Sequence, residues 1–377
     1  MADVFLRRMA GRVRAGIVVG THRAIELPPP IEWVEAGHPV PNTESVRAGL
    51  FALRTAAAVE PDESLVVLLS GGASALLAVP QGGLGLDDKQ EVTGILLGAG
   101  ADIHALNAVR KHLSRIKGGW LAAASAGPTL ALAVSDVIGD DLSVIGSGPT
   151  VPDPSTFDDA LAAVDRLGVL ARLPVAARRL LECGHRGEAP ETPKPGDPRL
   201  DGSVARVIGS RLDALDGARA EAEALGYPVF VDDLPVTGEA REAGLLFVRR
   251  AADRARGSTP PLCILSAGET TVRVVGGGRG GRNQELALAT AGLIGCFGRD
   301  AVLASFGTDG VDGPTDAAGA LVDTTTLERA RAAGLPGADD VLAENDAYNF
   351  FRPLGDLLVT GPTDTNVGDV QVLLIGA

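Results

Sequence analysis

Short apolar runs alternate with longer stretches of helical periodicity through most of the chain. The clearest apolar runs of strand length lie at residues 15–19, 31–35, 64–69, 130–135, 204–208, 229–232, 262–265, 302–306 and 370–375. Between them, apolar residues recur at helical spacing, for example over 45–59, 86–98, 212–225 and 239–256. Because strands alternate with helices, the pattern predicts parallel sheets and an α/β fold.

Two domains are expected, because 377 residues exceed a single domain of ordinary size. Residues 187–202 are rich in proline, glycine and charge, a composition typical of a linker. We therefore expect an N-terminal domain over residues 1–195 and a C-terminal domain over 203–377.

Charge and composition exclude several classes of partner. The net charge of −14 argues against nucleic acid, and an anionic substrate would need a local positive patch. No apolar stretch reaches the length of a membrane span, so a membrane partner is not expected. The cysteines show no CxxC spacing and the histidines no HxH or HExxH pair, which favours a reducing cytoplasm and argues against zinc.

The stretch 262–288 carries the most distinctive local pattern. A predicted strand at 262–265 leads into Gly268, Glu269 and Thr270, and a second predicted strand follows at 272–275. Glycines then surround Arg279 before Arg282 opens an apolar helix. Glycine-rich backbone, a helix start and arginine side chains all suit an anion, so this loop is predicted to bind a carboxylate or phosphate. The alternative is a flexible glycine-rich hairpin with solvated arginines.

A second candidate loop follows the buried strand at 64–69. Small residues and hydroxyls at a predicted helix start are common in phosphate-binding loops. The loop lacks the Gly-Lys-Ser/Thr of a Walker A motif and does not fit a GxSxG nucleophile elbow. An ordinary strand–helix turn is the alternative. The residues concerned are Ser70, Gly71, Gly72 and Ser74.

Carboxylates gather in two further loops that each follow a predicted strand. Asp136, Asp140 and Asp141 come just after the strand at 130–135, and residues 308–316 contain Asp309 and Asp312. Such groups can hold Mg²⁺ or accept a hydroxyl proton. Turns with Asx caps are the alternative for both loops.

The predicted helix over residues 103–125 adds positive charge. Asn107, Lys111, Ser114 and Lys117 recur at spacings of three and four, which would place them on one helix face. This face is interpreted as a cationic wall, or alternatively as a solvated helix surface. Together with the carboxyl-end loops of an open α/β sheet, these patterns predict an enzyme that binds phosphates with Mg²⁺ and transfers one.

At these same residues the chain resembles the class II glycerate 2-kinases, also called the MOFRL family and often labelled hydroxypyruvate reductases. The similarity covers about residues 1–375 and is carried by 70–77, 107–119, 135–156, 266–288 and 305–320. It implies ATP- and Mg²⁺-dependent phosphorylation of D-glycerate to 2-phospho-D-glycerate. It also implies an N-terminal Rossmann-like parallel-sheet domain, a C-terminal mixed α/β domain with its signature module at about 262–377, and an active site in the cleft between the domains.

The resemblance and the loop patterns together nominate site residues. The catalytic candidates are Asp136, Asp140, Arg279 and Arg282, and the metal candidates are Asp136, Asp140 and Asp312. The candidates for binding substrate or nucleotide are Ser70, Gly71, Gly72, Ser74, Asn107, Lys111, Lys117, Ser147, Gly148, Gly268, Glu269, Thr270, Asn283, Glu285 and Asp309.

The chain departs from the family pattern in three places. Family members begin with a further segment that carries a Gly-Lys-Ala loop, and no residue here matches its lysine, which is thought to be catalytic. The usual third glycine of Ser-Gly-Gly-Gly-Ser is Ala73, and Arg211 replaces the Asn of Ile-Gly-Ser-Asn. We therefore expect the natural chain to begin upstream; the alternative is an inactive, poorly folding remnant.

Two rival functions stay open at this stage. The first is an NAD(P)H-dependent hydroxypyruvate reductase, which the absence of a G-x-G-x-x-G after the first strand disfavours. The second is a truncated, non-catalytic binder of glycerate or nucleotide. A small-molecule substrate is expected, with the chain acting as a monomer or homodimer.

Overall fold

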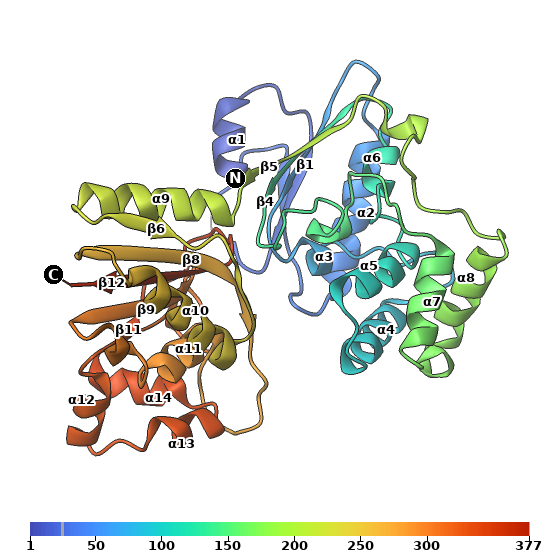
Figure 1. The fold of residues 1–377 in the computed structure, drawn as a ribbon. Helices are drawn as coiled ribbons and strands as arrows, with labels where there is room; N and C mark the ends of the chain where they lie inside the picture. The colour runs from blue at the N-terminus through green and yellow to red at the C-terminus, as the bar shows by residue number, and fades with distance from the viewer. Residues whose placement is uncertain (24–25, 377) are drawn as a thin grey trace. The chain divides into compact units, whose positions relative to one another are not determined.

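Apolar strands flanked by amphipathic helices form in both halves of the chain, which confirms the predicted α/β class. The computed structural model describes residues 1–23 and 26–376. Contacts divide the chain into two units (Figure 1): unit 1 is Met1–Ala133 with Asp140–Ile208, and unit 2 is Val134–Gly139 with Gly209–Ala377. No helix within the described ranges is long and apolar enough to cross a bilayer.

Unit 1 holds small parallel sheets and a group of helices. Strands β1 and β2 pair in parallel, and a separate sheet has the order β3-β4-β5 with β3 parallel to β4. The elements are α1 (Ala2–Arg8), β1 (Gly16–Gly20), β2 (Ile31–Glu35), α2 (Thr43–Ala57), β3 (Leu65–Leu69), α3 (Ala73–Leu76), α4 (Leu86–Gly98), α5 (Ile103–His112), α6 (Trp120–Ala123), β4 (Thr129–Val134), α7 (Phe157–Arg166), α8 (Val175–His185) and β5 (Val204–Gly209).

The main core of unit 1 lies between helices α4, α5, α7 and α8. Leu96, Val109, Val164 and Leu181 come from these four helices and are fully buried together. Phe157 is 1% exposed, and its ring lies where a side chain on Gly184 would be: an added Cβ would come within 2.1 Å of it. The close approach of α7 and α8 therefore depends on glycine at this position.

Unit 2 is built on one seven-stranded mixed sheet. Its order is β11-β10-β9-β12-β8-β6, and β7 pairs with the far end of β8. Strand β12 runs antiparallel between β8 and β9, whereas β6 and β7 are parallel to β8. The elements are α9 (Arg211–Ala224), β6 (Val229–Val231), β7 (Val236–Glu239), α10 (Ala240–Ala255), β8 (Leu262–Thr271), α11 (Arg282–Thr290), β9 (Ala301–Gly307), β10 (Gly319–Asp323), α12 (Thr326–Ala332), α13 (Ala338–Ala343), α14 (Ala347–Phe351), β11 (Leu357–Leu358) and β12 (Asp369–Ile375).

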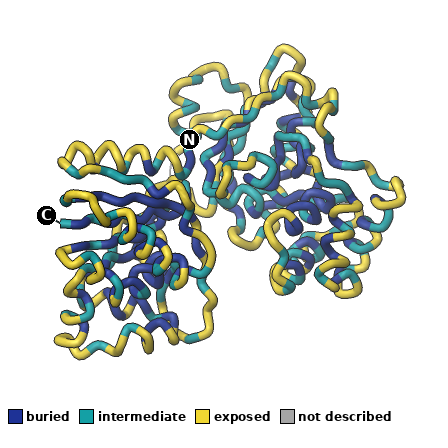
Figure 2. The backbone as a smooth tube through the Cα atoms, in the orientation of Figure 1, coloured by how far each residue is buried: buried dark blue, intermediate teal, exposed yellow. Residues whose placement is uncertain are grey.

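Helices cover both faces of this sheet because its central strand is apolar on both sides. Side chains alternate along β8: Leu262 and Ile264 join the core under α10 and α11, and Cys263 and Leu265 join the core under α9. Figure 1 shows α9 on one side of the sheet and α10 and α11 on the other. Figure 2 shows that the backbone of the central strands is buried while the outer helices are exposed. Cys263 is a buried residue of β8.

The prediction of one long helix over 103–125 is wrong. Helix α5 ends at His112 and only the short α6 follows. Gly118 and Gly119, further along, adopt positive φ values of 56° and 87°, a conformation that a continuous α-helix excludes, and Gly119 lies at the N-cap of α6. Lys117 therefore does not share a helix face with Lys111.

Two further expectations differ from the structure. Residues 262–265 and 272–275 were expected as separate strands, but β8 continues to Thr271 because β12 and β7 pair with its second half, and it ends where the second strand was predicted. The predicted linker 187–202 packs within unit 1, where Thr192 is 3% exposed, and unit 1 continues to Ile208 because β5 pairs with β4.

Replacing Gly184 with alanine should destabilise the protein, because the new methyl group would overlap the ring of Phe157. Overpacking of this kind costs about 1–3 kcal/mol. The matched control is Gly217→Ala in α9, where nothing lies within 4 Å of the added Cβ. The control should be neutral or should stabilise by about 0.5–1 kcal/mol. Urea unfolding of both variants measures the difference, and equal midpoints would contradict the packing described above.

Candidate active site

Four of the predicted site residues, drawn from separate segments, meet in unit 1. Lys117 Nζ donates to Ser74 O at 2.7 Å and to Ser74 Oγ at 2.9 Å. Ser74 Oγ lies 2.8 Å from Ser147 Oγ, and Ser147 Oγ donates to Asn107 Oδ1 at 2.9 Å. We call these four residues the unit 1 cluster. The structure thus joins the loop after β3, helix α5 and the turn that follows β4.

Local backbone bends bring the two serines together. Gly72 has a φ of 81°, and the ring of His38, from the loop after β2, lies against it. Ser147 itself has a φ of 63° between two glycines in the same conformation. A left-handed serine is strained, and such strain is concentrated at functional sites. Ala73, which replaces a family glycine, is not among the described residues with positive φ, so alanine fits there.

Positive charge surrounds the unit 1 cluster. Burial, together with the nearby charges of Lys89 and Arg110, lowers the pKa of Lys117 well below its usual value. Burial and Arg110 also lower the pKa of Lys89 to about 7. Lys89 lies on α4 and is only 4% exposed. Three basic side chains, those of Lys89, Arg110 and Lys117, are therefore close enough to influence one another at this cluster.

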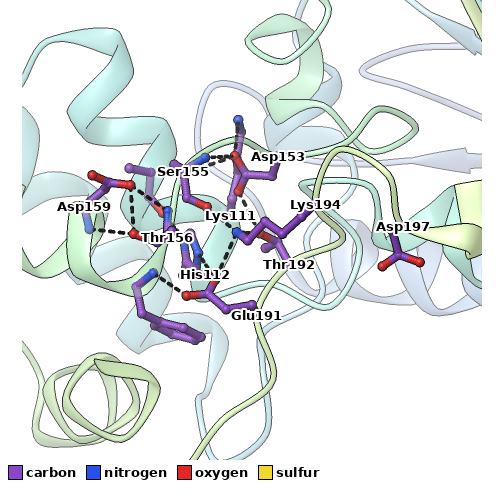
Figure 3. A network of polar contacts seen from close by, with 12 residues as sticks. Lys111, His112, Asp153, Ser155, Thr156, Asp159, Glu191, Thr192, Lys194 and Asp197 are labelled. Atoms are coloured by element: carbon purple, nitrogen blue, oxygen red, sulfur yellow. Dashed lines mark hydrogen bonds and ion pairs between the residues drawn. The ribbon is translucent and has the colours of Figure 1, made fainter. Parts of the chain in front are cut away.

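Lys111 belongs to a different network, so the predicted cationic wall needs correction. Its Nζ lies 3.1 Å from Asp153 Oδ1, and Figure 3 shows the carboxylates and hydroxyls that surround this pair. Thr192 Oγ1 donates to the other oxygen of Asp153 at 3.0 Å. Burial opposes ionisation, but Lys111 and hydrogen bonds from Ser155 lower the pKa of Asp153. Lys111 is thus a buried partner of Asp153 and ties the 191–194 segment to α5.

In unit 2 a bidentate ion pair fixes Arg282 at the start of α11. Its Nε and Nη2 donate to the two carboxylate oxygens of Asp369 at 2.6 and 2.8 Å. Asp369 is fully buried at the first position of β12, directly opposite Gly268 of β8 and Gly307 of β9. The pair raises the pKa of Arg282, so its guanidinium stays charged.

Further carboxylates lie around this arginine. Burial raises the pKa of Glu269; Arg282 opposes that shift, and Asp136, Asp369 and Asp309 add to it. Much of the Glu269 side chain is nevertheless accessible to solvent. Asn366 Nδ2 donates to Asp136 Oδ2 at 3.0 Å. We call Asp136, Glu269, Arg282, Asp309 and Asp369 the unit 2 cluster; it lies at the edge where β8 and β9 end and β12 begins.

Several N–H groups of the glycine-rich loop before α11, which is predicted to bind an anion, donate to acceptors of the protein itself. The N–H groups of Val275 and Gly276 donate to Asn345 Oδ1, and that of Gly278 donates to Glu344 O. A Cβ on Gly276 or Gly278 would come within 2.5 Å of residues 344–346. The glycines therefore allow close packing of two chain segments, and this packing explains the pattern that resembled an anion loop.

The start of α11 is likewise occupied by a protein group. Asp312 Oδ1 accepts from Asn283 N at 3.0 Å, and Oδ2 accepts from Gln284 N at 2.9 Å. Burial raises the pKa of Asp312 to about 6, against the lowering effect of these two hydrogen bonds. Because both oxygens are engaged, Asp312 acts as a helix cap, which corrects its predicted role as a metal ligand.

The remaining predicted residues of unit 2 are held by neighbouring side chains and strands. Gly268 lies so close to Val236 that a Cβ would meet its carbonyl oxygen at 2.0 Å. Ser305 Oγ donates to Asn283, and Arg241 and Asn345 donate to Glu285. Arg279 is exposed and stacks 4.4 Å from the ring centre of Tyr348. Thr270 is buried, and its Oγ1 has no partner among the described residues.

The carboxylates predicted to hold metal are divided between the two units. Asp136 belongs to unit 2 and Asp140 to unit 1. Asp140 shares with Ser147 the left-handed conformation, at a φ of 54°. Asp309 Oδ1 accepts from Val311 N, which is an Asx turn. Within the described parts of the chain, no group of three histidine, cysteine or acidic side chains could hold a metal ion by itself.

The sequence analysis missed two charged residues at these clusters. Lys89 was read only as part of a helix, although its place near the start of α4 turns it inward. Asp369 was read only as preceding a closing strand. A recognisable signal existed, since an antiparallel central strand brings its first residue to the edge where its parallel neighbours end.

Comparison with known proteins gives consistent family matches. The domain of unknown function DUF4147 matches residues 1–182, and the MOFRL family model matches 262–369. A glycerate 2-kinase of Pyrococcus horikoshii is 39% identical over 92% of this chain and 78% of its own length. The crystal structure of Thermotoga maritima glycerate kinase has 37% identity and a TM-score of 0.87, covering 100% of this chain and 88% of that one. An Agrobacterium vitis protein provisionally named hydroxypyruvate reductase is 43% identical over 96% of this chain and 81% of its length.

Replacing Lys111 with methionine should destabilise unit 1 strongly, because it leaves the buried carboxylate of Asp153 without its ammonium partner. Removing one member of a buried pair typically costs about 3–5 kcal/mol. The loss should be full at pH 7 and should shrink below the ordinary Asp pKa of 3.8, because the folded-state pKa of Asp153 is lowered. Chemical denaturation at several pH values measures it. The double variant Lys111→Met/Asp153→Asn should recover part of the loss; if it recovers none, the pair is not the cause.

Proposed function

Since the chain belongs to the glycerate 2-kinase family, we propose that it transfers the terminal phosphoryl group of ATP to the 2-hydroxyl of D-glycerate. The product is 2-phospho-D-glycerate. The observation that carries the proposal is the arginine of the unit 2 cluster: Asp369 holds Arg282 in a fixed bidentate geometry, at a sheet edge that also carries carboxylates. A charged guanidinium in a fixed orientation, with carboxylates beside it, is the combination of groups that phosphoryl transfer requires.

Arg282 is assigned to the transferring phosphoryl group. Its bonds to Asp369 use Nε and Nη2, which leaves N–H groups of the planar fork that can donate to phosphate oxygens. The partly exposed side chain can reach a ligand, and Asp369 prevents it from rotating away. Stabilisation of the charge on a transferring phosphoryl group by such an arginine lowers the barrier of the chemical step.

Asp136 is assigned to the 2-hydroxyl of glycerate. It was nominated together with Asp140, but Asp136 contributes to the electrostatic environment of Glu269 in the unit 2 cluster. Asn366 donates to one of its oxygens and orients the carboxylate. A carboxylate in this position can accept the hydroxyl proton as the oxygen attacks phosphorus.

Mg²⁺ is proposed to bind with the nucleotide. The unit 2 cluster fits this group in one respect: Mg²⁺ in nucleotide sites is usually held by one or two carboxylates and by the phosphates themselves, so a complete protein cage is unnecessary. Asp136 and Asp309 are the carboxylates that we propose would contribute. When bound, the ion would offset the negative charge of the phosphates.

Reduction of hydroxypyruvate is the second candidate, because relatives carry that name. The segment that follows β1 is Thr21-His22-Arg23 and not a G-x-G-x-x-G loop, so the usual pyrophosphate-binding turn is missing. We therefore favour the kinase.

The direct test measures ADP release from ATP and Mg²⁺ with and without D-glycerate, beside NADH oxidation with hydroxypyruvate. We expect ADP release that requires D-glycerate and that stops when EDTA removes the metal, and no NADH oxidation. NADH oxidation without ADP release would overturn the assignment in favour of a reductase.

Replacing Arg282 with lysine should lower kcat at least about 100-fold, because lysine keeps the charge but loses the bidentate geometry. The matched control is Arg250→Lys. Arg250 forms a similar pair with Asp232 at 2.7 Å in unit 2, and its side chain is 24% exposed against 26% for Arg282. The control should change stability without changing kcat per folded molecule. Equal kcat values for the two variants would remove Arg282 from the chemistry.

A further inference from the structure

Three buried donor groups around the unit 1 cluster have no partner in the protein. Lys89 Nζ, Asn107 Nδ2 and Arg110 Nε are inaccessible to solvent and make no hydrogen bond within the described residues. Lys89 and Asn107 are 4% and 3% exposed. A buried donor left unpaired costs about 1–3 kcal/mol, and more if it is charged. Their concentration in one place indicates that a ligand supplies the acceptors.

The amide of Asn107 is aimed by a chain of hydrogen bonds. Lys117 donates to Ser74, whose hydroxyl lies next to that of Ser147, and Ser147 donates to Asn107 Oδ1. Because Ser147 occupies the amide oxygen, the NH₂ group points to the opposite side, where it has no partner. A chain of donors that all run in one direction also polarises the amide and strengthens it as a donor.

The ligand must carry negative charge. Burial and Arg110 lower the pKa of Lys89, and no carboxylate among the described residues opposes this shift. Burial, Lys89 and Arg110 likewise lower the pKa of Lys117. The protonated forms of these side chains repel one another in a poorly solvated place, and a neutral ligand would leave that repulsion in force, whereas an anion would favour protonation.

We propose that Lys89, Asn107 and Arg110 form a subsite within unit 1 that binds the carboxylate of a small hydroxy acid, an inference that rests on the proposed function for the choice of D-glycerate as that acid. A three-carbon hydroxy acid has one permanently charged group, and a planar carboxylate can accept from an ammonium, an amide and a guanidinium together. The subsite would therefore select hydroxy acids against polyols of the same size, such as glycerol. The phosphates of the nucleotide are assigned to Arg282 instead.

The test uses Lys89→Met in the full chain, with Lys194→Met as the matched control. Lys194 is a lysine of the same unit outside the cluster, with 32% of its side chain exposed. Removing Lys89 should raise the melting temperature of the ligand-free protein, because it removes a buried unpaired cation, so loss of folding is not expected. The KM for D-glycerate should rise roughly 10- to 100-fold with kcat changed less than about 3-fold. The control variant should change neither the KM for D-glycerate nor kcat.

Binding measured without turnover separates this proposal from the proposed function. Thermal stabilisation and calorimetry should detect D-glycerate binding to the wild type and its loss in Lys89→Met, while ADP binding is retained. If Lys89→Met loses D-glycerate binding but the wild type never releases ADP, the result would support the subsite and contradict the kinase assignment. Unchanged D-glycerate binding by Lys89→Met would overturn the proposed subsite. A variant that loses only the binding of ADP or inorganic phosphate would overturn it as well.

Proton uptake gives a second readout of the same subsite. Because the pKa of Lys89 is lowered to about 7 by burial and Arg110, binding a carboxylate at pH 8 should draw a proton onto the amine. Calorimetry in buffers of different ionisation enthalpy measures that proton. Uptake by the wild type that disappears in Lys89→Met is expected; identical uptake in both proteins would exclude Lys89 as the group that meets the carboxylate.

Discussion

The buried carboxylate of Asp312 is the interaction on which the arrangement of unit 2 depends. It accepts the first free N–H groups of α11 and so joins the 308–316 loop to the helix start. Gly281 must be glycine, because a Cβ there would meet Asp312 at 2.3 Å. With the loop fixed in this way, the next residue, Arg282, is directed toward Asp369. A cap that ordinarily adds only helix stability therefore also sets the position of the arginine in the unit 2 cluster.

Much of this arrangement could be predicted from the sequence, because strand ends in an α/β fold place loops at one edge of the sheet. That rule placed the loop that contains Ser74 beside the loop that follows the strand at 130–135, whereas Asn107 and Lys117 were predicted from helical spacing and Ser147 from the family resemblance. It also placed Glu269 and Asp309 near one another. The rule predicts which side chains lie close together. It does not predict which of them faces a ligand and which forms hydrogen bonds or ion pairs within the protein.

The difference between lying close to a site and facing a ligand explains why some residues could not be assigned from the sequence. Lys111 and Lys117 have the same residue type and lie close in sequence, yet one is neutralised by Asp153 and the other lies among cations. The difference depends on Asp153 and on the end of α5 at His112, and no spacing rule links these. The glycine pattern of the loop before α11 has a second physical explanation, because close packing against residues 344–346 also requires glycine.

The two clusters also satisfy opposite electrostatic demands within one acidic chain. With a net charge of −14, the protein repels anions at long range, so attraction must come from short-range, poorly screened groups. Unit 2 meets the demand with a single arginine whose charge is balanced by Asp369. Unit 1 does the reverse: Lys89, Arg110 and Lys117 are left without carboxylate partners in the described structure. Unbalanced buried charge reduces the stability of the folded protein. This loss of stability is explained if a bound ligand supplies the missing negative charge, because binding an anion relieves a repulsion that folding alone leaves in place.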